Sequence, residues 1–273
     1  MTVKLGVSLF EIAFWVYLAA AACYVGFLVR GRRVLGTAGI ALLLIGLLAH
    51  TASMVVRTIA TRQPPFLNLY EYMLSLTWSA VLVYLVLEWT TKTKVFGSFG
   101  VPLIALSAFI TRSLSAAPKP VPPALLSIWR VPHIGSATLA YAAFGIAFCL
   151  AIMYIIRARS EEDEQSFWAV RLPSPDVLDH TIYRTVAFGF LMETLLILTG
   201  ALWAQKSWAR YWGWDNKETW SLITWLVYAV YLHTRAIGWK GRKSAVLAMI
   251  GFAVAMFTLF GVSYFLSGLH SYV

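Results

Sequence analysis

Apolar and polar residues alternate along this chain in long blocks rather than at single positions. Eight blocks are apolar over about the 20 residues that an α-helix needs to cross a bilayer, and short polar segments separate them. The fourth block is the weakest, because it contains Pro102 and two glycines. This pattern predicts an all-α integral membrane protein with about eight transmembrane helices, at residues 7–29, 36–56, 69–89, 95–112, 133–157, 181–204, 219–238 and 244–267.

The composition supports this fold class. Hydrophobic residues make up 60% of the 273 residues and charged residues 12%, which is too little polar surface for a water-soluble domain. No internal repeat separates the chain, so residues 1–273 are expected to form one polytopic membrane domain. Cys23 and Cys149 both lie inside apolar blocks and form no Cys-x-x-Cys pair, which favours small buried side chains over a redox motif.

The basic residues predict an orientation. The net charge is +10, but the Lys and Arg residues lie in short segments between spans, as in membrane proteins, so nucleic acid is not an expected partner. Because basic loops stay inside, both termini are expected on the outer side, periplasmic or lumenal. The inner loops hold Arg30, Arg32, Arg33, Lys92, Lys94, Arg157, Arg159, Arg171, Arg235, Lys240, Arg242 and Lys243.

Two connecting segments have a distinctive composition. On the inner side, acidic residues 161–164 and the Pro173-Ser-Pro175 loop are typical of a solvated linker. On the outer side, residues 118–123 contain four prolines and cannot be helical throughout, whereas residues 124–130 could form a short helix along the interface. Three outer elements are expected to converge: this loop, residues 203–220 and the C-terminal tail.

Residues 203–220, between the sixth and seventh spans, form an external tryptophan-rich segment. Interfacial Trp residues occur in many membrane proteins, but a general aromatic belt would be spread over several loops. Five of the twelve tryptophans in one connection favour a dedicated platform for a large planar ligand: Trp203, Trp208, Trp212, Trp214 and Trp220.

Charged residues in the same segment have two readings each. Asp215 and Glu218 have the spacing of a helix capping box, and that structural role is the first expectation, although Asp215 is also a candidate ligand contact. Lys206, Arg210 and Lys217 are either partners for carboxylates of a ligand or solvated loop cations. No general acid or base is identifiable.

Two histidines lie on the tryptophan side. His133 begins the fifth span, and His270 follows the eighth. Haem iron takes axial histidine while its porphyrin can stack on aromatic rings, so two imidazoles from different helices could hold one iron. The alternative for each is a polar residue at the interface.

The other histidines are less informative. His233 lies near the inner end of the seventh span, where an ionisable group is costly unless it faces a cavity or partner; it is either a ligand of a second, inner site or extends to the headgroups beside Arg235. His50 is expected to pack inside the protein, and His180 to face water.

These residues resemble a known family. Gly200-Ala-Leu-Trp-Ala204, Trp208-Ala-Arg-Tyr-Trp212 and Trp214-Asp-Asn-Lys-Glu-Thr-Trp220 look like the tryptophan-rich WWD signature of haem-handling proteins in cytochrome c maturation. Together with Asn68-Leu-Tyr-Glu71 and Tyr183-Arg184, the Lys-Glu-Thr-Trp ending is similar to the CcsA-type (ResC-type) subunit of the system II cytochrome c synthase. The resemblance extends from about residue 40 to the end.

The resemblance implies a function and a set of ligands. His133 and His270 match the external histidines that ligate haem in the family, and His233 matches the membrane histidine of an inner site whose second ligand belongs to a CcsB-type (ResB-type) partner. Such a subunit moves haem b across the membrane and presents it for attachment to the Cys-x-x-Cys-His motif of apocytochrome c. This implies haem lyase activity together with the partner, in a bacterial cytoplasmic membrane or a thylakoid membrane.

Two positions depart from the family pattern, and two other functions stay open. Asn216 stands where the family commonly has proline, and Ala209 where it often has glycine. One alternative is a WWD protein that loads haem onto a chaperone, although such relatives typically have six spans. The other is a non-catalytic membrane assembly factor whose tryptophans only anchor it.

Overall fold

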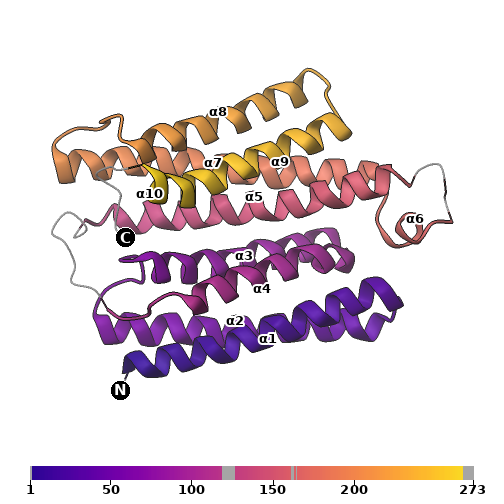
Figure 1. The fold of residues 1–273 in the computed structure, drawn as a ribbon, viewed down its shortest axis with the longest axis horizontal. Coiled ribbons are helices and arrows are strands. Elements are labelled where there is room, and N and C mark those ends of the chain that lie inside the picture. Colours follow the sequence, from indigo (N-terminus) through magenta and orange to yellow (C-terminus); the bar gives the residue numbers. More distant parts are fainter. Residues whose placement is uncertain (1, 119–126, 161–162, 164, 267–273) are drawn as a thin grey trace. The chain divides into compact units, whose positions relative to one another are not determined.

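The computed structural model describes residues 2–118, 127–160, 163 and 165–266, and all regular elements in these ranges are helices (Figure 1). The predicted all-α fold is therefore confirmed. The chain divides into two compact units, unit 1 from Met1 to Pro120 and unit 2 from Val121 to Val273. Whether they act as one polytopic domain stays a prediction.

Unit 1 is a bundle in which α1 packs along α2 and α4, and α3 packs against α4. Small residues allow the close approach of α1 and α2: a Cβ on Gly46 would lie 2.5 Å from the Tyr17 ring. In the interior, the Tyr24 and Tyr84 hydroxyls both donate to the Glu88 carboxylate. The elements are α1 (Thr2–Arg30), α2 (Arg33–Thr61), α3 (Leu69–Thr91), the 3-10 turn η1 (Lys94–Phe96) and α4 (Gly97–Ser113).

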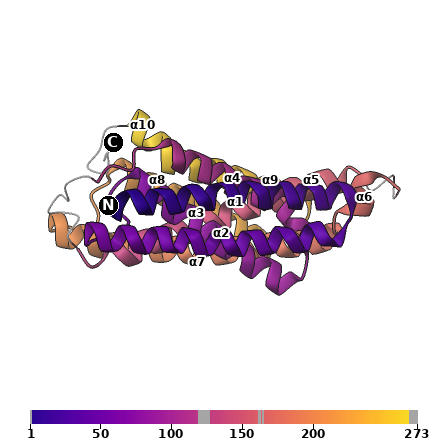
Figure 2. The same cartoon turned by 90° about the horizontal axis from the view of Figure 1, so that it is seen from below.

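Unit 2 is built around two long helices, α5 and α7, which run alongside each other (Figures 1 and 2). Helix α9 packs against α5 and α8, and α8 also contacts α7. The elements are α5 (Arg130–Ala158), α6 (Phe167–Arg171), α7 (Pro175–Trp208), α8 (Asn216–Ala236), α9 (Arg242–Met256), the π-helical segment η3 (Phe257–Gly261) and α10 (Val262–Phe265).

The two ends of unit 2 differ in chemistry. We call the end where α5 begins, α7 ends and α8 begins the tryptophan end, because residues 203–220 lie there. The other end, where α7 and α9 begin, is called the opposite end. Gly200 of α7 lies beside His133 of α5, and Gly189 lies beside Phe144, so the two helices are antiparallel.

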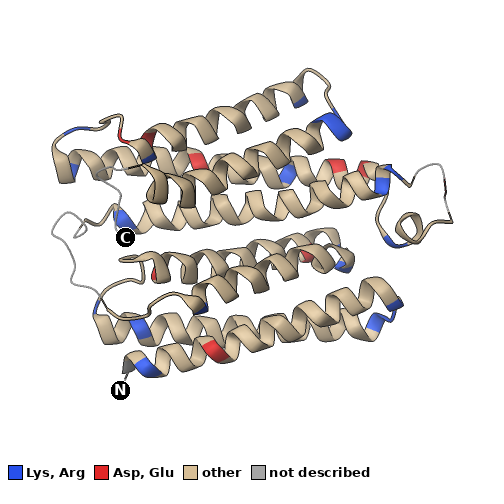
Figure 3. Ribbon diagram, viewed as in Figure 1, with Lys and Arg blue, Asp and Glu red and all other residues tan. Residues whose placement is uncertain are grey.

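Seven of the described helical segments are long and apolar enough to cross a membrane, which indicates a multi-pass membrane protein. Each of the eight predicted spans corresponds to a helical segment. The segment outside the seven is α8, which has 21 residues but begins with polar Asn216, Lys217, Glu218 and Thr219. Lys and Arg residues lie mostly at helix ends and in connections (Figure 3).

Two connections differ in detail from the expectation. The short helix α6 lies within the predicted inner linker, capped by the Ser166 side chain, which accepts from the Ala169 amide. Helix α7 begins at Pro175, six residues before the predicted span, because proline is well suited to the first turn of a helix. The short outer helix expected at residues 124–130 falls mostly outside the described residues.

Candidate functional site

His133 lies at the tryptophan end of unit 2, packed against α7. Its Nδ1 is 2.9 Å from the carbonyl oxygen of Leu196, and its ring meets the edge of Trp203 at a centroid distance of 5.3 Å. Gly200 makes this fit possible, because a Cβ there would lie 2.9 Å from Cε1 of the imidazole. The structure thus brings together two residues predicted for the site, one from α5 and one from α7.

The contact with Leu196 determines what the imidazole can do. A carbonyl oxygen only accepts, so Nδ1 carries the proton and donates it, and the lone pair of the neutral ring is placed on Nε2. Metal-binding histidines are commonly oriented in this way, with one ring nitrogen donating to a carbonyl and the other binding the metal. His133 therefore has the tautomer of an axial ligand.

The tryptophans of residues 203–220 lie at different depths. Trp203 is 4% exposed inside α7, whereas Trp214 is 69% exposed in the loop before α8. Trp212 meets Trp214 edge to face at 5.7 Å, and the Trp212 Nε1 donor has no hydrogen-bond partner among the described residues. The segment therefore combines one indole beside His133 with others presented in the loop.

The loop backbone is held in an uncommon conformation at two positions. Ala209, which ends α7, has φ 55°, and Trp214 has φ 56°. The left-handed region costs a non-glycine residue about 1–2 kcal/mol, and such strain is concentrated at functional sites. Trp214 is therefore an exposed, bulky residue that this loop holds in a strained conformation.

Asp215 and Glu218 form the predicted capping box. The Asp215 side chain caps α8 by accepting from the Lys217 amide, while the Glu218 carboxylate accepts from the Asp215 amide at 3.2 Å and the Gly213 amide at 2.7 Å. The structural reading of both acids is confirmed. Through these bonds α8 fixes the backbone on both sides of Trp214.

Trp220, at the start of the second turn of α8, connects this loop to the end of α9. Its ring lies 4.4 Å from that of Phe257, and its carbonyl accepts from the Thr258 hydroxyl, which is also 2.8 Å from Thr224 Oγ1. Phe257 and Thr258 belong to the π-helical segment η3, and such insertions are frequent at functional sites. His270, farther along the chain, lies outside the described residues.

His233 lies toward the opposite end of unit 2 and has a different environment. It is exposed, on the same face of α8 as exposed Leu226 and Val230. The nearby Arg235 is paired with Asp179, since its Nη1 donates to both carboxylate oxygens at 2.8 Å. An imidazole on an outward apolar face is accessible to a ligand or a second subunit.

The remaining histidines have the environments expected for them. His50 is fully buried in unit 1, where its Nδ1 lies 3.2 Å from the Tyr17 hydroxyl. His180 is exposed at the start of α7. Of the three cations considered for ligand carboxylates, Lys206 and Arg210 are exposed and Lys217 is half-buried. Among the described residues, His133 is thus the one histidine at the tryptophan end.

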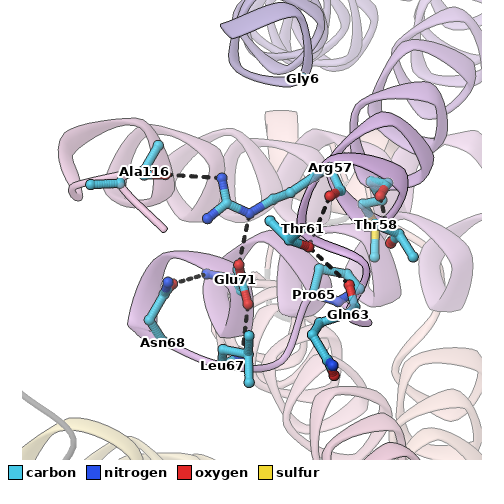
Figure 4. A network of polar contacts seen from close by, with 12 residues as sticks. Gly6, Arg57, Thr58, Thr61, Gln63, Pro65, Leu67, Asn68, Glu71 and Ala116 are labelled. Atoms are coloured by element: carbon cyan, nitrogen blue, oxygen red, sulfur yellow. Dashed lines mark hydrogen bonds and ion pairs between the residues drawn. The ribbon is translucent and has the colours of Figure 1, made fainter. Parts of the chain in front are cut away.

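The Asn68-Leu-Tyr-Glu71 motif forms a polar network in unit 1 that the sequence did not predict (Figure 4). The Asn68 side chain caps α3 by accepting from the Glu71 amide. Buried Arg57 donates through Nε to Glu71 at 2.8 Å and through Nη1 to the carbonyl of Ala116 at 3.0 Å. The motif therefore fixes the connection between α2 and α3, and Arg57 is its partner.

Two further residues of unit 2 were missed from the sequence. Gly200 matters through the absence of a side chain, which only the packing against His133 reveals. Glu193 is fully buried in α7, and its signal was available, since it is the only acidic residue in the predicted span 181–204. No cluster of three or more metal-binding side chains occurs among the described residues, so iron bound here would need its remaining ligands from the porphyrin or elsewhere.

Comparison with known proteins gives a consistent result. Residues 66–270 match the family described as Cytochrome C assembly protein. Relatives named Cytochrome c biogenesis protein CcsA include one from Trieres chinensis, 35% identical and covering 76% of this chain and 77% of its own, and one from Parasynechococcus marenigrum, 35% identical and covering 86% of each. A third, from Chlamydomonas reinhardtii, is 39% identical over 76% of this chain and 60% of its own.

A solved structure shares the fold. The chain named Cytochrome c Heme Lyase CcmF aligns with 94% of this chain at a TM-score of 0.69 and 15% identity, and this chain spans 47% of its length. The similarity to CcsA-type proteins expected from the tryptophan segment is confirmed by the family match and by the relatives. The chain belongs to the cytochrome C assembly protein family.

Proposed function

We propose that this protein, which has a role in cytochrome c biogenesis, is the haem-handling subunit of a system II cytochrome c synthase. The observation that carries the proposal is the arrangement of His133, whose Nδ1 donates to Leu196 and whose ring lies beside Trp203. With Nδ1 donating, the neutral ring has the tautomer whose Nε2 lone pair can bind a metal, and the adjoining Trp203 indole suits a flat aromatic substrate such as haem b.

The second ligand of the outer site is assigned to His270. The chain reaches that residue from η3, whose Phe257 contacts Trp220 at the tryptophan end, and only a few residues separate the last described position, Leu266, from His270. The strained, exposed Trp214 and the Trp212 Nε1 donor are the groups of the loop that would contact the substrate. With both termini outside, this end faces the periplasm or lumen.

In this role the protein contributes mainly positioning. The apocytochrome would place its Cys-x-x-Cys-His segment beside the bound haem, and each thiol would add across a vinyl group, sulfur to one carbon and hydrogen to the other. Holding the reactants together accelerates such an addition without a general acid or base. The histidine of the apocytochrome then takes an axial position and lowers the affinity of the synthase for its product.

For the inner site we assign His233 as the ligand from this chain. Its exposed position beside Leu226 and Val230 suits contact with a membrane helix of another protein, which would provide the second imidazole. A CcsB-type subunit is the partner proposed for this face. Haem would bind there first and then move to the outer site, in a bacterial cytoplasmic or thylakoid membrane.

The test is the visible spectrum of the protein purified with its partner from haem-replete cells. Wild-type protein is expected to show a Soret band and sharp bands on reduction, and His133→Ala to lose most of the outer haem. His233→Ala should lose inner haem and recover part of it in added imidazole. A colourless wild-type protein would instead support an anchoring role for the tryptophans, and full haem in both variants would refute the ligand assignments.

A further inference from the structure

Glu193 is a carboxyl group in the middle of α7 with an unusual environment. It is 0% exposed, and neither of its side-chain oxygens has a hydrogen-bond partner among the described residues. An isolated carboxylate inside a membrane helix is costly and is a functional feature by default. The nearby Thr194 hydroxyl cannot relieve it by its own proton, which goes to the Phe190 carbonyl.

A line of polar groups leads from Glu193 toward the opposite end of unit 2. Tyr228 stacks on Phe144 at 3.7 Å, and Phe144 packs against Gly189, one turn before Glu193 on α7. Tyr231 lies about one turn from Arg235, which pairs with Asp179. Tyr228 and Tyr231 are both fully buried, and neither hydroxyl has a partner in the described part of the chain. Their spacing of three residues places both on one face of α8.

Helix α9 carries another buried polar group, nearer the opposite end. Ser244 is 1% exposed with its hydroxyl unpartnered among the described residues, and it lies two turns from Gly251 on the same helix face. A Cβ on Gly251 would be 2.7 Å from Cζ and 3.1 Å from the hydroxyl of Tyr228, so the tyrosine packs directly against the α9 backbone. Buried polar atoms without protein partners are usually hydrogen-bonded to ordered water.

The line ends at Glu193. Beyond it on the same face of α7 come Leu196, Gly200 and Trp203, and the Thr194 hydroxyl is already engaged by Trp225 Nε1 and the Phe190 carbonyl. On α5, the level between His133 and Phe144 includes Tyr141, which is buried. Helices α5 and α9 contain no carboxylate, and their Lys and Arg residues lie at the helix ends, so neither helix places a charged group at this level.

We propose that Glu193 is a proton-binding site in the interior of unit 2, loaded through water held by Tyr228, Tyr231 and Ser244 from the opposite end. A proton suits this site better than a metal cation, because one carboxyl group and tyrosine hydroxyls offer too few oxygen ligands for a metal. Leu196, whose carbonyl orients His133, lies about 4.5 Å farther along the α7 axis. Neutralising Glu193 thus changes the charge close to the candidate ligand, a consequence that rests on the proposed function.

Infrared difference spectroscopy of the purified protein tests proton binding without requiring haem. Wild-type protein at neutral pH should show the carbonyl stretch of an un-ionised carboxylic acid, which moves in D₂O and is converted into carboxylate as the pH rises. Glu193→Gln should remove this band. Glu193→Leu, which removes the carboxyl group and leaves no buried polar group, provides the same comparison if the glutamine variant fails to fold.

Two other variants test the route and the assignment. Tyr228→Phe keeps the ring stacked on Phe144 at 3.7 Å but removes the hydroxyl, and it should shift the band and slow its exchange in D₂O. Glu88→Gln, in unit 1, removes a buried carboxyl that already accepts from two tyrosines and should leave the Glu193 band in place.

Three results would overturn the proposal. These are identical spectra for wild type and Glu193→Gln, a Glu193 band that does not respond to pH, and a band that never exchanges in D₂O. A protein that binds no haem but shows the titrating band would refute the proposed function and leave the proton site supported. Normal haem spectra without the band would refute the proton site and leave the proposed function supported.

Discussion

Gly200→Ala changes the candidate site without changing any polar group. The added Cβ would lie 2.9 Å from Cε1 and 3.0 Å from Nδ1 of His133. Because the imidazole is the far end of a side chain, the ring should move rather than the helices. Movement would lengthen the Nδ1 contact with the Leu196 carbonyl and weaken the edge contact with Trp203.

The expected magnitudes separate stability from binding. The hydrogen bond contributes about 0.5–1.5 kcal/mol and the ring contact a similar amount, whereas alanine gains about 1 kcal/mol over glycine inside a helix. The net change in the free energy of unfolding should therefore be below about 2 kcal/mol. If displacement of the His133 ring weakens haem binding by roughly 2 kcal/mol, the affinity for haem should fall about thirtyfold.

Gly135→Ala is the matched control. It makes the same substitution in α5 two residues after His133, and no atom lies within 4 Å of the added Cβ. Both variants should be purified, their unfolding followed in detergent, and haem titrated by the Soret absorbance. Equal affinity for haem in Gly200→Ala and Gly135→Ala, with both folded, would refute the reasoning that the packing of α7 positions His133.

The other predictions concern the loop and the buried charges. Ala209→Gly should raise the free energy of unfolding by up to about 1 kcal/mol, because φ 55° is strained for alanine. Trp214→Gly should change the free energy of unfolding little, since the relieved strain offsets the lost contact with Trp212, and it should still lower haem binding. Unchanged haem binding in Trp214→Gly would contradict a role for that indole. Glu218→Gln should destabilise the start of α8 by about 1 kcal/mol, seen as faster amide exchange at Gly213 and Asp215, and unaltered exchange would speak against the cap. Arg57→Met should destabilise unit 1 by about 3–5 kcal/mol in denaturant unfolding, because buried Glu71 loses its partner. The double variant Arg57→Met with Glu71→Leu should recover part of this loss. No recovery would mean that lost packing, and not the unpaired charge, causes the destabilisation.

Much of the fold could be predicted because membrane helices have a strong local signal. The apolar blocks located each span within several residues. Helices α7 and α8 begin earlier than the predicted spans, because proline and capping residues, rather than hydropathy, set where they begin. The capping box was predictable for the same reason, since Asp215 and Glu218 are close in the sequence.

The site was only partly predictable, because its geometry depends on contacts between distant helices. His133 and Trp203 are 70 residues apart, and nothing local indicates that Gly200 packs against His133. The clustering of tryptophans predicted one platform, but Trp203 is buried whereas Trp214 is exposed. The pairing of Arg57 with Glu71 likewise depends on how α2 meets α3.

The central claim is that His133 binds the iron of haem at the tryptophan end of unit 2. Near-infrared magnetic circular dichroism of the oxidised protein tests it most directly, because the charge-transfer band reports the pair of axial ligands. With His233→Ala used to remove the inner haem, a bis-imidazole band is expected, and adding His133→Ala should abolish or shift it. An unchanged bis-imidazole band after loss of His133 would contradict the claim.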